Sequence, residues 1–235
     1  MSEQPVAYAL ADDIATLTLD DGKVNALSPA TIAALHRALD RAEREAAAVL
    51  LVGRPGRFSG GFDLSVMTGA TDGLRALVTA GAELLLRLYL YPRSVVAACT
   101  GHAIAAGALL LLASDIRIGA RGPFKIGLNE VVIQLTLPIF AMELARDRLA
   151  TRWFTRAVTQ AQIFDPEGAC EAGYLDQVAA PDALLATARA LAERLAALPN
   201  PAFAETKRRE RGATVDRIRA TLAHDIATLT TPVPA

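Results

Sequence analysis

The chain has 235 residues, 52% of them hydrophobic, and its 24 Lys and Arg residues nearly balance its 25 Asp and Glu residues. High apolar content with a net charge of only −1 excludes an intrinsically disordered chain. No positive excess is present to displace counterions, which argues against a nucleic-acid-binding protein that works through overall charge. The length favours one large domain, or one domain with an appendage.

The two cysteines and the apolar runs bear on the compartment. Cys99 and Cys170 are far apart in apolar contexts, so reduced thiols are favoured over a disulfide framework or a metal site. The first residues lack the basic start and apolar segment of a signal peptide. The longest apolar run, Ala103 to Ala113, is far shorter than the ~20 residues that span a bilayer. We therefore expect a soluble, cytoplasmic protein without a membrane partner.

The first part of the chain is typical of a hairpin followed by a helix. Apolar segments at 6–10 and 14–19 are separated by Ala-Asp-Asp, which predicts two antiparallel strands. Ser28 and Pro29 are typical of a helix N-cap and of the first helical residue.

Strands and helices then alternate. A continuous apolar run at 47–52 predicts a strand buried on both faces. A glycine-rich loop at 57–63 and a helix at 73–90 follow. The order repeats with a strand, a turn, a helix and two short strands predicted at 94–99, 101–102, 105–113, 115–118 and 123–126. Almost everything after residue 137 reads as helical, so the pattern indicates an α/β core with a helical C-terminal appendage.

Several common catalytic motifs are absent from the sequence. It has no nucleophile elbow, P-loop, dinucleotide-binding glycine motif or HExxH zinc motif. The three histidines, His36, His102 and His224, show no metal-ligand spacing. We therefore expect no metal and no cofactor, and any catalysis must come from carboxylates and backbone dipoles.

Two small-residue segments suit the binding of an oxyanion. In Phe58 to Leu64, consecutive glycines follow a predicted strand and can direct free N–H groups at a ligand. In Gly101 to Ala108, small residues open a helix whose first amides are unpaired. One N–H group from each segment would form an oxyanion hole. A plain turn and a tightly packed helix are the alternative.

The same segments resemble the motifs of the crotonase (enoyl-CoA hydratase/isomerase) superfamily. Phe58 to Leu64 is similar to its F-x-x-G-x-D-L motif, and Val95 to Ile118, with GHAIAAGA and SDIRIG, is similar to its glycine-rich helix motif. Asn25 begins a match to its early N-A-L element, and the segment at 165–178 resembles a later one. The resemblance covers nearly the whole chain in order, and its closest active-site match is to Δ3,Δ2-enoyl-CoA isomerases.

This resemblance implies that the backbone N–H groups of Phe62 and Ala106 form the oxyanion hole. Ala105 and Ala106 stand where the family has two glycines. Because the donor is a backbone group, alanine keeps it, and we expect ordinary helical backbone angles at both positions.

The acid–base residues depart from the hydratase pattern. Hydratases of the family carry a glutamate where this chain has Leu109, and leucine can neither orient water nor transfer a proton. The position of the second family glutamate holds Glu130, within an I-G-L-N-E string that resembles the isomerase branch. The resemblance thus implies that Glu130 alone moves a proton from C2 to C4 of a 3-enoyl-CoA. An exposed loop carboxylate is the alternative.

Further residues are expected, by resemblance, to contact the CoA or acyl part of the substrate. Backbone around Lys23, Val24 and Ala26 would hold the adenine and pantetheine. The full set is Lys23, Val24, Ala26, Gly60, Gly61, Asp63, Leu64, Met67, Gly107, Leu109 and Lys207. From its position, Asp63 is also typical of a helix N-cap. Apolar side chains such as Met67 and those at 84–90 would border an acyl tunnel or simply form core.

One basic cluster stands out near the C-terminus, at Lys207, Arg208, Arg209 and Arg211. The resemblance makes Lys207 the nearest match to a lysine that reaches CoA phosphates. A solvated helix face is the alternative, and an RNA-binding patch is a third.

The resemblance implies a crotonase (ClpP-like) α/β fold, a spiral of ββα units. We expect a core at 1–180 and a C-terminal helical region at 181–235 that mediates trimer formation, giving a homotrimer or a hexamer of two trimers. The expected substrate is an acyl-CoA thioester, and the preferred activity is Δ3-enoyl-CoA to Δ2-enoyl-CoA isomerisation. A hydratase or another thioester enzyme of the family is the alternative, and a non-catalytic acyl-CoA-binding protein is the alternative of another class.

Overall fold

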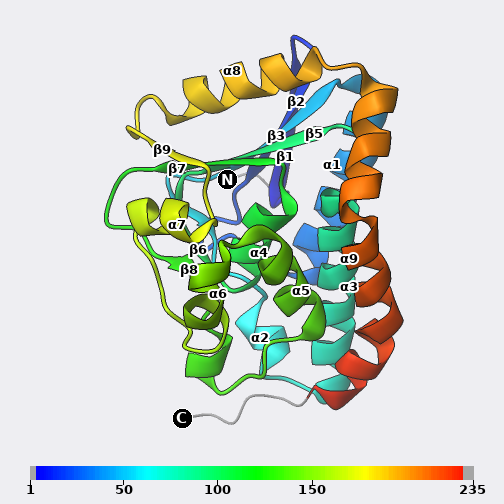
Figure 1. Cartoon of the computed structure of the whole chain (residues 1–235), viewed down its shortest axis with the longest axis vertical. Helices are drawn as coiled ribbons and strands as arrows, with labels where there is room; N and C mark the ends of the chain where they lie inside the picture. The colour runs from blue at the N-terminus through cyan, green and yellow to red at the C-terminus, as the bar shows by residue number, and fades with distance from the viewer. Residues whose placement is uncertain (1–3, 230–235) are drawn as a thin grey trace.

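The computed structural model describes residues 4–229, which form two sheets surrounded by helices (Figure 1). The strands are β1 (Val6–Ala11), β2 (Ile14–Leu19), β3 (Ala48–Gly53), β4 (Gly56–Ser59), β5 (Ser94–Cys99), β6 (Gly101–Ile104), β7 (Ile116–Ala120), β8 (Ile126–Gly127) and β9 (Gln177–Ala179). The helices are α1 (Pro29–Glu45), α2 (Leu64–Met67), α3 (Thr71–Tyr89), α4 (Ala106–Ala113), the 3-10 helix η1 (Glu130–Ile133), α5 (Ile139–Arg148), α6 (Thr151–Val158), α7 (Pro166–Ala172), α8 (Leu184–Ala196) and α9 (Asn200–Thr228).

The chain builds both sheets at once by repeating a pair of strands and a helical segment. The larger sheet has the order β1-β2-β3-β5-β7-β9, and the smaller has the order β4-β6-β8. Each of the pairs β3/β4, β5/β6 and β7/β8 therefore gives one strand to each sheet. Apart from the antiparallel β1/β2 hairpin, the strand pairs are parallel. This arrangement confirms the predicted spiral of ββα units.

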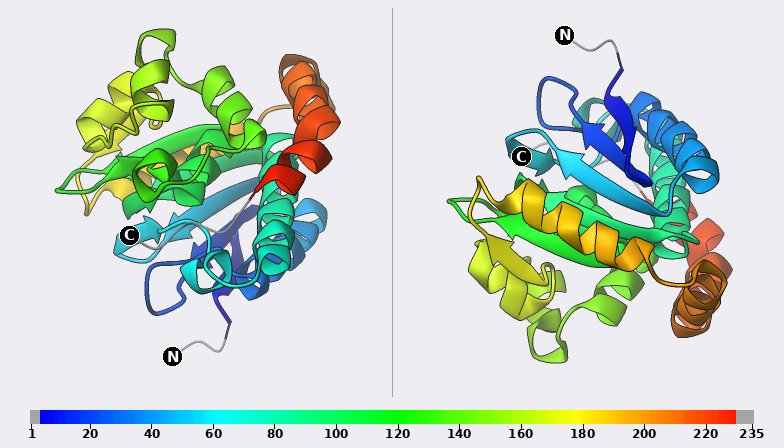
Figure 2. Two further views of the ribbon diagram at one scale, coloured as in Figure 1. Left: turned by 90° about the horizontal axis from the view of Figure 1, so that it is seen from below. Right: turned by 90° about the horizontal axis from the view of Figure 1, so that it is seen from above.

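The larger sheet is covered on both faces, as the apolar run at 47–52 predicted. Val49 and Leu51 of β3 point into the main core, whereas Leu50 and Val52 point to the opposite face, toward α8. Figure 2 shows α8 lying across this face of the sheet. Burial on both sides explains why the strand is continuously apolar rather than alternating.

Two predictions at glycine-rich sites were wrong in detail. The predicted loop at 57–63 starts inside β4, and the predicted turn at Gly101 is the start of β6. A Cβ atom on Gly101 would lie 2.0 Å from the backbone of Gly56, so glycine is needed there because two strands pair closely. The strand β9 was missed within the predicted helical region.

The basic cluster does not form one exposed patch, and the expected CoA-binding role of Lys207 is wrong for this structure. Lys207 is only 3% exposed, and its Nζ lies 2.8 Å from Asp115 Oδ2. Arg211 Nη1 lies 2.9 Å from the other oxygen of the same carboxylate. These contacts fasten α9 to the core, while the neighbouring Arg208 and Arg209 pair with Glu205 on the surface.

The C-terminal helices pack on the core rather than standing apart from it. Helix α8 covers the larger sheet, and α9 packs along α3 and α5. The boundary proposed between 180 and 181 falls just after β9, and it stays a prediction. Within residues 4–229, every helix is too short or too polar to cross a bilayer. Cys99 and Cys170 are both free thiols.

Candidate active site

The segments singled out in the sequence meet because each comes after a strand of the smaller sheet. Gly60 and Gly61 follow β4, Ala105 follows β6, and Glu130 follows β8 after two residues. The three strands are parallel, so their carboxyl ends lie at one edge of the sheet. That edge is where ligands bind in open α/β sheets.

The two expected oxyanion-hole donors lie on neighbouring segments. A Cβ atom on Gly61 would be 3.2 Å from Ala106 N, so the glycine loop and the start of α4 are in contact. In the bridge between Leu27 and Phe62, Leu27 N donates to Gly61 O and Asp63 N donates to Leu27 O. The N–H of Phe62 takes no part in these hydrogen bonds. Among the described residues, neither Phe62 N nor Ala106 N has a hydrogen-bond acceptor. A free amide at the N-terminus of α4 and a second on the neighbouring loop suit an oxyanion.

The backbone at Ala105 corrects one expectation. Ala106 begins α4, but Ala105 has φ +53° and ψ −124° rather than ordinary helical angles. Such angles normally belong to glycine, and alanine adopts them at a cost of about 1–3 kcal/mol. The sharp turn at Ala105 directs the chain from β6 into α4 and leaves the N–H of Ala106 free.

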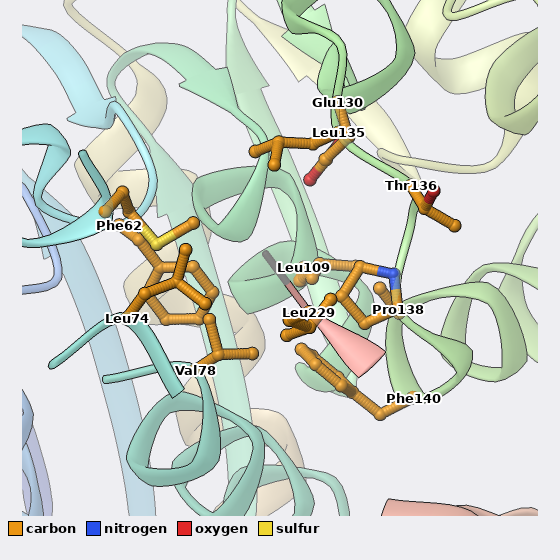
Figure 3. Close-up of a pocket in the computed structure, with 12 residues that line it drawn as sticks. Phe62, Leu74, Val78, Leu109, Glu130, Leu135, Thr136, Pro138, Phe140 and Leu229 are labelled. Atoms are coloured by element: carbon orange, nitrogen blue, oxygen red, sulfur yellow. The ribbon is translucent and has the colours of Figure 1, made fainter. Parts of the chain in front are cut away.

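Phe62 also lines a small, mostly apolar pocket of about 40 Å³ (Figure 3). Its lining residues are Phe62, Met67, Leu74, Val78, Leu109, Glu130, Leu135, Thr136, Pro138, Phe140, Ala141 and Leu229. Of these described residues, Glu130 alone carries a carboxylate. The pocket can therefore hold an apolar group against one proton-transfer residue.

Glu130 is buried, which excludes the exposed-loop alternative. Glu130 is only 8% exposed, and its Oε2 has no hydrogen-bond partner in the described part of the chain. Burial raises the pKa of Glu130 to about 7, although the backbone amides of Glu130 and Asn129 partly oppose the shift. A carboxyl group with a pKa near neutrality can both accept and return a proton.

Leu109 lies in the same pocket, in the first turn of α4, and is 1% exposed. The pocket therefore brings together Phe62, Met67, Leu109 and Glu130, as the sequence predicted, and Ala106 lies one turn before Leu109 at the start of α4. Gly107 lies next to them but packs against the backbone of Ser59, where a Cβ atom would be 2.2 Å from the carbonyl oxygen.

A second, larger cleft of about 500 Å³ adjoins the pocket through Phe62, which lines both. Its lining residues are Pro5, Asp21, Lys23, Val24, Ala26, Ser28, Ala30, Thr31, Gly60, Phe62, Asp63, Leu64 and Ser65. Most of the residues predicted to contact CoA therefore share one cleft. Asp63 also caps α2 by accepting hydrogen bonds from Ser65 N and Oγ, as its position predicted.

The backbone of this cleft is held by two residues whose role the sequence analysis did not identify. The Asp21 carboxylate accepts hydrogen bonds from the N–H groups of Lys23, Asn25 and Ala26. Buried Asn25, with φ +55°, donates to the carbonyl groups of Leu19, Arg57 and Phe58. The N–H groups of Lys23 and Ala26 are thus already engaged within the protein.

Several lining residues of the pocket were not predicted. Leu74 and Val78 come from the first half of α3, whereas the segment at 84–90 considered for a tunnel is ordinary core. Thr136, Pro138 and Phe140 come from the loop before α5 and its first turn. These residues have no shared sequence motif, and their helical spacing alone equally suits core packing.

Metal ligands are not gathered anywhere in the part of the chain from 4 to 229, because no three His, Cys, Asp or Glu side chains are arranged to hold an ion.

The comparisons with known proteins agree with the motifs. A family model described as enoyl-CoA hydratase/isomerase matches residues 10–233. The chain is 31% identical over 210 residues to the human protein named enoyl-CoA delta isomerase 1, mitochondrial, covering 87% of this chain and 70% of that protein.

Two solved structures are also similar over nearly their whole length. An enoyl-CoA hydratase/isomerase family protein from Pseudomonas syringae is 45% identical with a TM-score of 0.94, covering 96% of this chain and 98% of that one. A Mycobacterium tuberculosis protein, named an enoyl-CoA isomerase in one solved structure and a probable enoyl-CoA hydratase in another, is 40% identical with a TM-score of 0.92 in the first, covering 96% of this chain and 99% of that one. These similarities confirm the predicted family resemblance and fold class.

Proposed function

The chain belongs to the enoyl-CoA hydratase/isomerase family, and on that premise we propose that it converts 3-enoyl-CoA to 2-enoyl-CoA with Glu130 as the only acid–base residue. The observation that carries the proposal is the pairing of Glu130 with Leu109. The pocket offers one buried carboxylate, and its other walls come from side chains that do not transfer protons.

The first step is removal of a C2 proton from the substrate. The N–H groups of Phe62 and Ala106 donate hydrogen bonds to the thioester oxygen, which becomes negative as the C2–H bond breaks. This interaction strengthens as charge develops, so it stabilises the dienolate more than the substrate. The Glu130 carboxylate accepts the proton.

The second step returns the same proton at C4. The electron pair of the C3–C4 double bond forms the new C4–H bond. The C1–C2 pair of the dienolate becomes the C2–C3 double bond, and the thioester carbonyl re-forms. A Glu130 pKa of about 7 suits both halves of this shuttle, because the group is a usable base and a usable acid near neutral pH.

Incubation of the purified protein with 3-hexenoyl-CoA, followed by mass-resolved chromatography, tests this activity. The proposal predicts 2-hexenoyl-CoA, with no change in mass. If the protein is instead a hydratase, 2-hexenoyl-CoA gains the mass of one water, and the proposal is wrong. An acyl-CoA-binding protein would be stabilised against heat by hexanoyl-CoA yet convert neither substrate.

Three further features remain part of the proposal. The expected oligomer is a homotrimer or a hexamer of two trimers. A measurement of the molecular mass in solution tests this expectation. The reaction as written needs no cofactor or metal, because the substrate itself supplies the proton and the electron pairs that move. Free Cys99 and Cys170 support a reducing compartment such as the cytoplasm.

A further inference from the structure

The end of α9 reaches the candidate pocket from a part of the chain far from the other site residues. Leu229, the residue directly after α9, lines the same pocket as Glu130 and packs against the main core. In Figure 3 its side chain lies among Val78, Pro138 and Phe140, well below Glu130. Leu229 therefore forms a wall of the pocket at a distance from the acid–base group.

Arg75 fastens the end of α9 to one side of the pocket. Its Nη2 donates to the carbonyl oxygen of Ala227 at 2.6 Å, and its Nε donates to that of Leu229 at 3.3 Å. The last carbonyl groups of a helix lack internal donors and carry the negative end of the helix dipole, so a guanidinium group suits them. Arg75 belongs to α3, whose Leu74 and Val78 also line the pocket.

Asp225 fastens the end of α9 to the other side. Its Oδ2 accepts a hydrogen bond from the N–H of Ile139, the first residue of α5, at 2.6 Å. No side chain of α5 itself caps this helix, so Asp225 provides the missing acceptor. Pro138 and Phe140, on either side of Ile139, line the pocket. The end of α9 is thus tied to both helices that border Leu229.

The pocket is small for a long acyl chain, with a volume of about 40 Å³ while Leu229 is in place. A long apolar chain therefore needs one of the walls to move. Leu229 follows the last turn of a helix, whereas most of the other walls lie within or between packed elements.

We propose that Leu229, held in place by Arg75 and Asp225, is the specificity-determining residue that restricts the substrate to short acyl chains. This inference rests on the proposed function, since it takes the pocket as the acyl site. Leu229 touches the acyl chain, and Arg75 and Asp225 are positioning residues that act through it.

The test measures the binding of two saturated, unreactive thioesters by calorimetry. We expect the wild-type protein to bind hexanoyl-CoA about tenfold more tightly than decanoyl-CoA, and Leu229→Ala to bind both about equally. Leu198→Ala, at a half-exposed leucine after α8, is the matched control and should keep the wild-type preference. Arg75→Gln should shift the preference in the same direction as Leu229→Ala, whereas Arg219→Gln, on an exposed face of α9, should not.

The outcomes separate this inference from the proposed activity. Equal binding of both thioesters by the wild-type protein, binding of neither, or an unchanged preference in Leu229→Ala would overturn it, even if 3-hexenoyl-CoA is isomerised. A length preference that Leu229→Ala removes, with no turnover of 3-hexenoyl-CoA, would support it and refute the isomerase.

Discussion

Leu109 and Glu130 line one pocket although they come from different ββα units, Leu109 from the first turn of α4 and Glu130 from the turn after β8. Both are nearly excluded from water. The position that carries a glutamate in hydratases, by the motif resemblance, is therefore an apolar wall facing a single carboxylate. Leu109 and Glu130 can each be replaced separately.

Replacement of Leu109 by glutamate should introduce hydration. A second carboxylate beside Glu130 supplies the group that orients and deprotonates water, and like-charge repulsion keeps one of the two protonated near neutral pH. We predict that Leu109→Glu adds water to 2-hexenoyl-CoA, seen as a gain in mass, whereas Leu109→Gln does not. Hydration by both variants, or by neither when both remain folded, would show that Leu109 does not decide between the two reactions.

The burial of Glu130 should make stability depend on pH. Because the folded-state pKa of about 7 lies above the ordinary value of 4.5, the folded state holds the proton more tightly than the unfolded chain. This contribution to stability is complete when the pH is below the ordinary pKa of 4.5, and it is lost as the pH rises through the folded-state pKa of about 7. Glutamine mimics the protonated form at every pH.

We therefore predict that the free energy of unfolding of the wild-type protein falls relative to Glu130→Gln, by about 2 kcal/mol between about pH 5 and about pH 8. Urea unfolding at the two pH values measures the difference. A constant difference would mean that Glu130 is not desolvated in the folded protein.

The strained turn at Ala105 gives a test with opposite signs at adjacent positions. Ala105→Gly should stabilise the protein by about 1 kcal/mol, because glycine adopts φ +53° without strain. Ala106→Gly, one residue later in α4, should destabilise it by up to about 1 kcal/mol through lost helix propensity. Thermal unfolding of both variants measures this, and equal effects would contradict the assigned backbone conformation.

The buried carboxylate of Asp115 should matter far more than exposed ones. It neutralises both Lys207 and Arg211, and burial lowers the pKa of Lys207 to about 8 even though Asp115 opposes that shift. Asp115→Asn leaves two buried cations unpaired and should cost about 3–5 kcal/mol in urea unfolding. Glu205→Gln, which removes exposed pairs with Arg208 and Arg209, should cost less than about 1 kcal/mol. Similar costs would contradict this role for Asp115.

The pattern of apolar residues predicted the larger sheet well because it records burial directly. The run at 47–52 is apolar on both faces, and Ser28 caps α1 by accepting a hydrogen bond from Thr31 N, as its type indicated. In the smaller sheet, β4 and β6 were missed, and β8 overlaps the strand predicted at 123–126 only at Ile126, because these strands are short and contain glycine. In single segments of this kind, a strand and a turn look alike.

The candidate site was predictable where its residues lie within short sequence motifs. Phe62, Ala106 and Glu130 each follow a strand, and the family resemblance identified all three. Leu229 was not predictable, because its place in the pocket depends on where a helix at the other end of the chain comes to rest. Lys207 was misassigned because a charged residue indicates solvent unless its buried partner, here Asp115, is known.

The most direct measurement of the central claim is the isomerisation rate of Glu130→Gln with 3-hexenoyl-CoA. Glutamine keeps the size of the side chain but cannot carry the proton, so the account predicts a loss of about 10²–10⁴-fold in kcat. Hexanoyl-CoA binding should be retained, since the amides of Phe62 and Ala106 are unchanged. A Glu130→Gln variant that isomerises 3-hexenoyl-CoA within about tenfold of the wild-type rate would contradict the single-carboxylate mechanism.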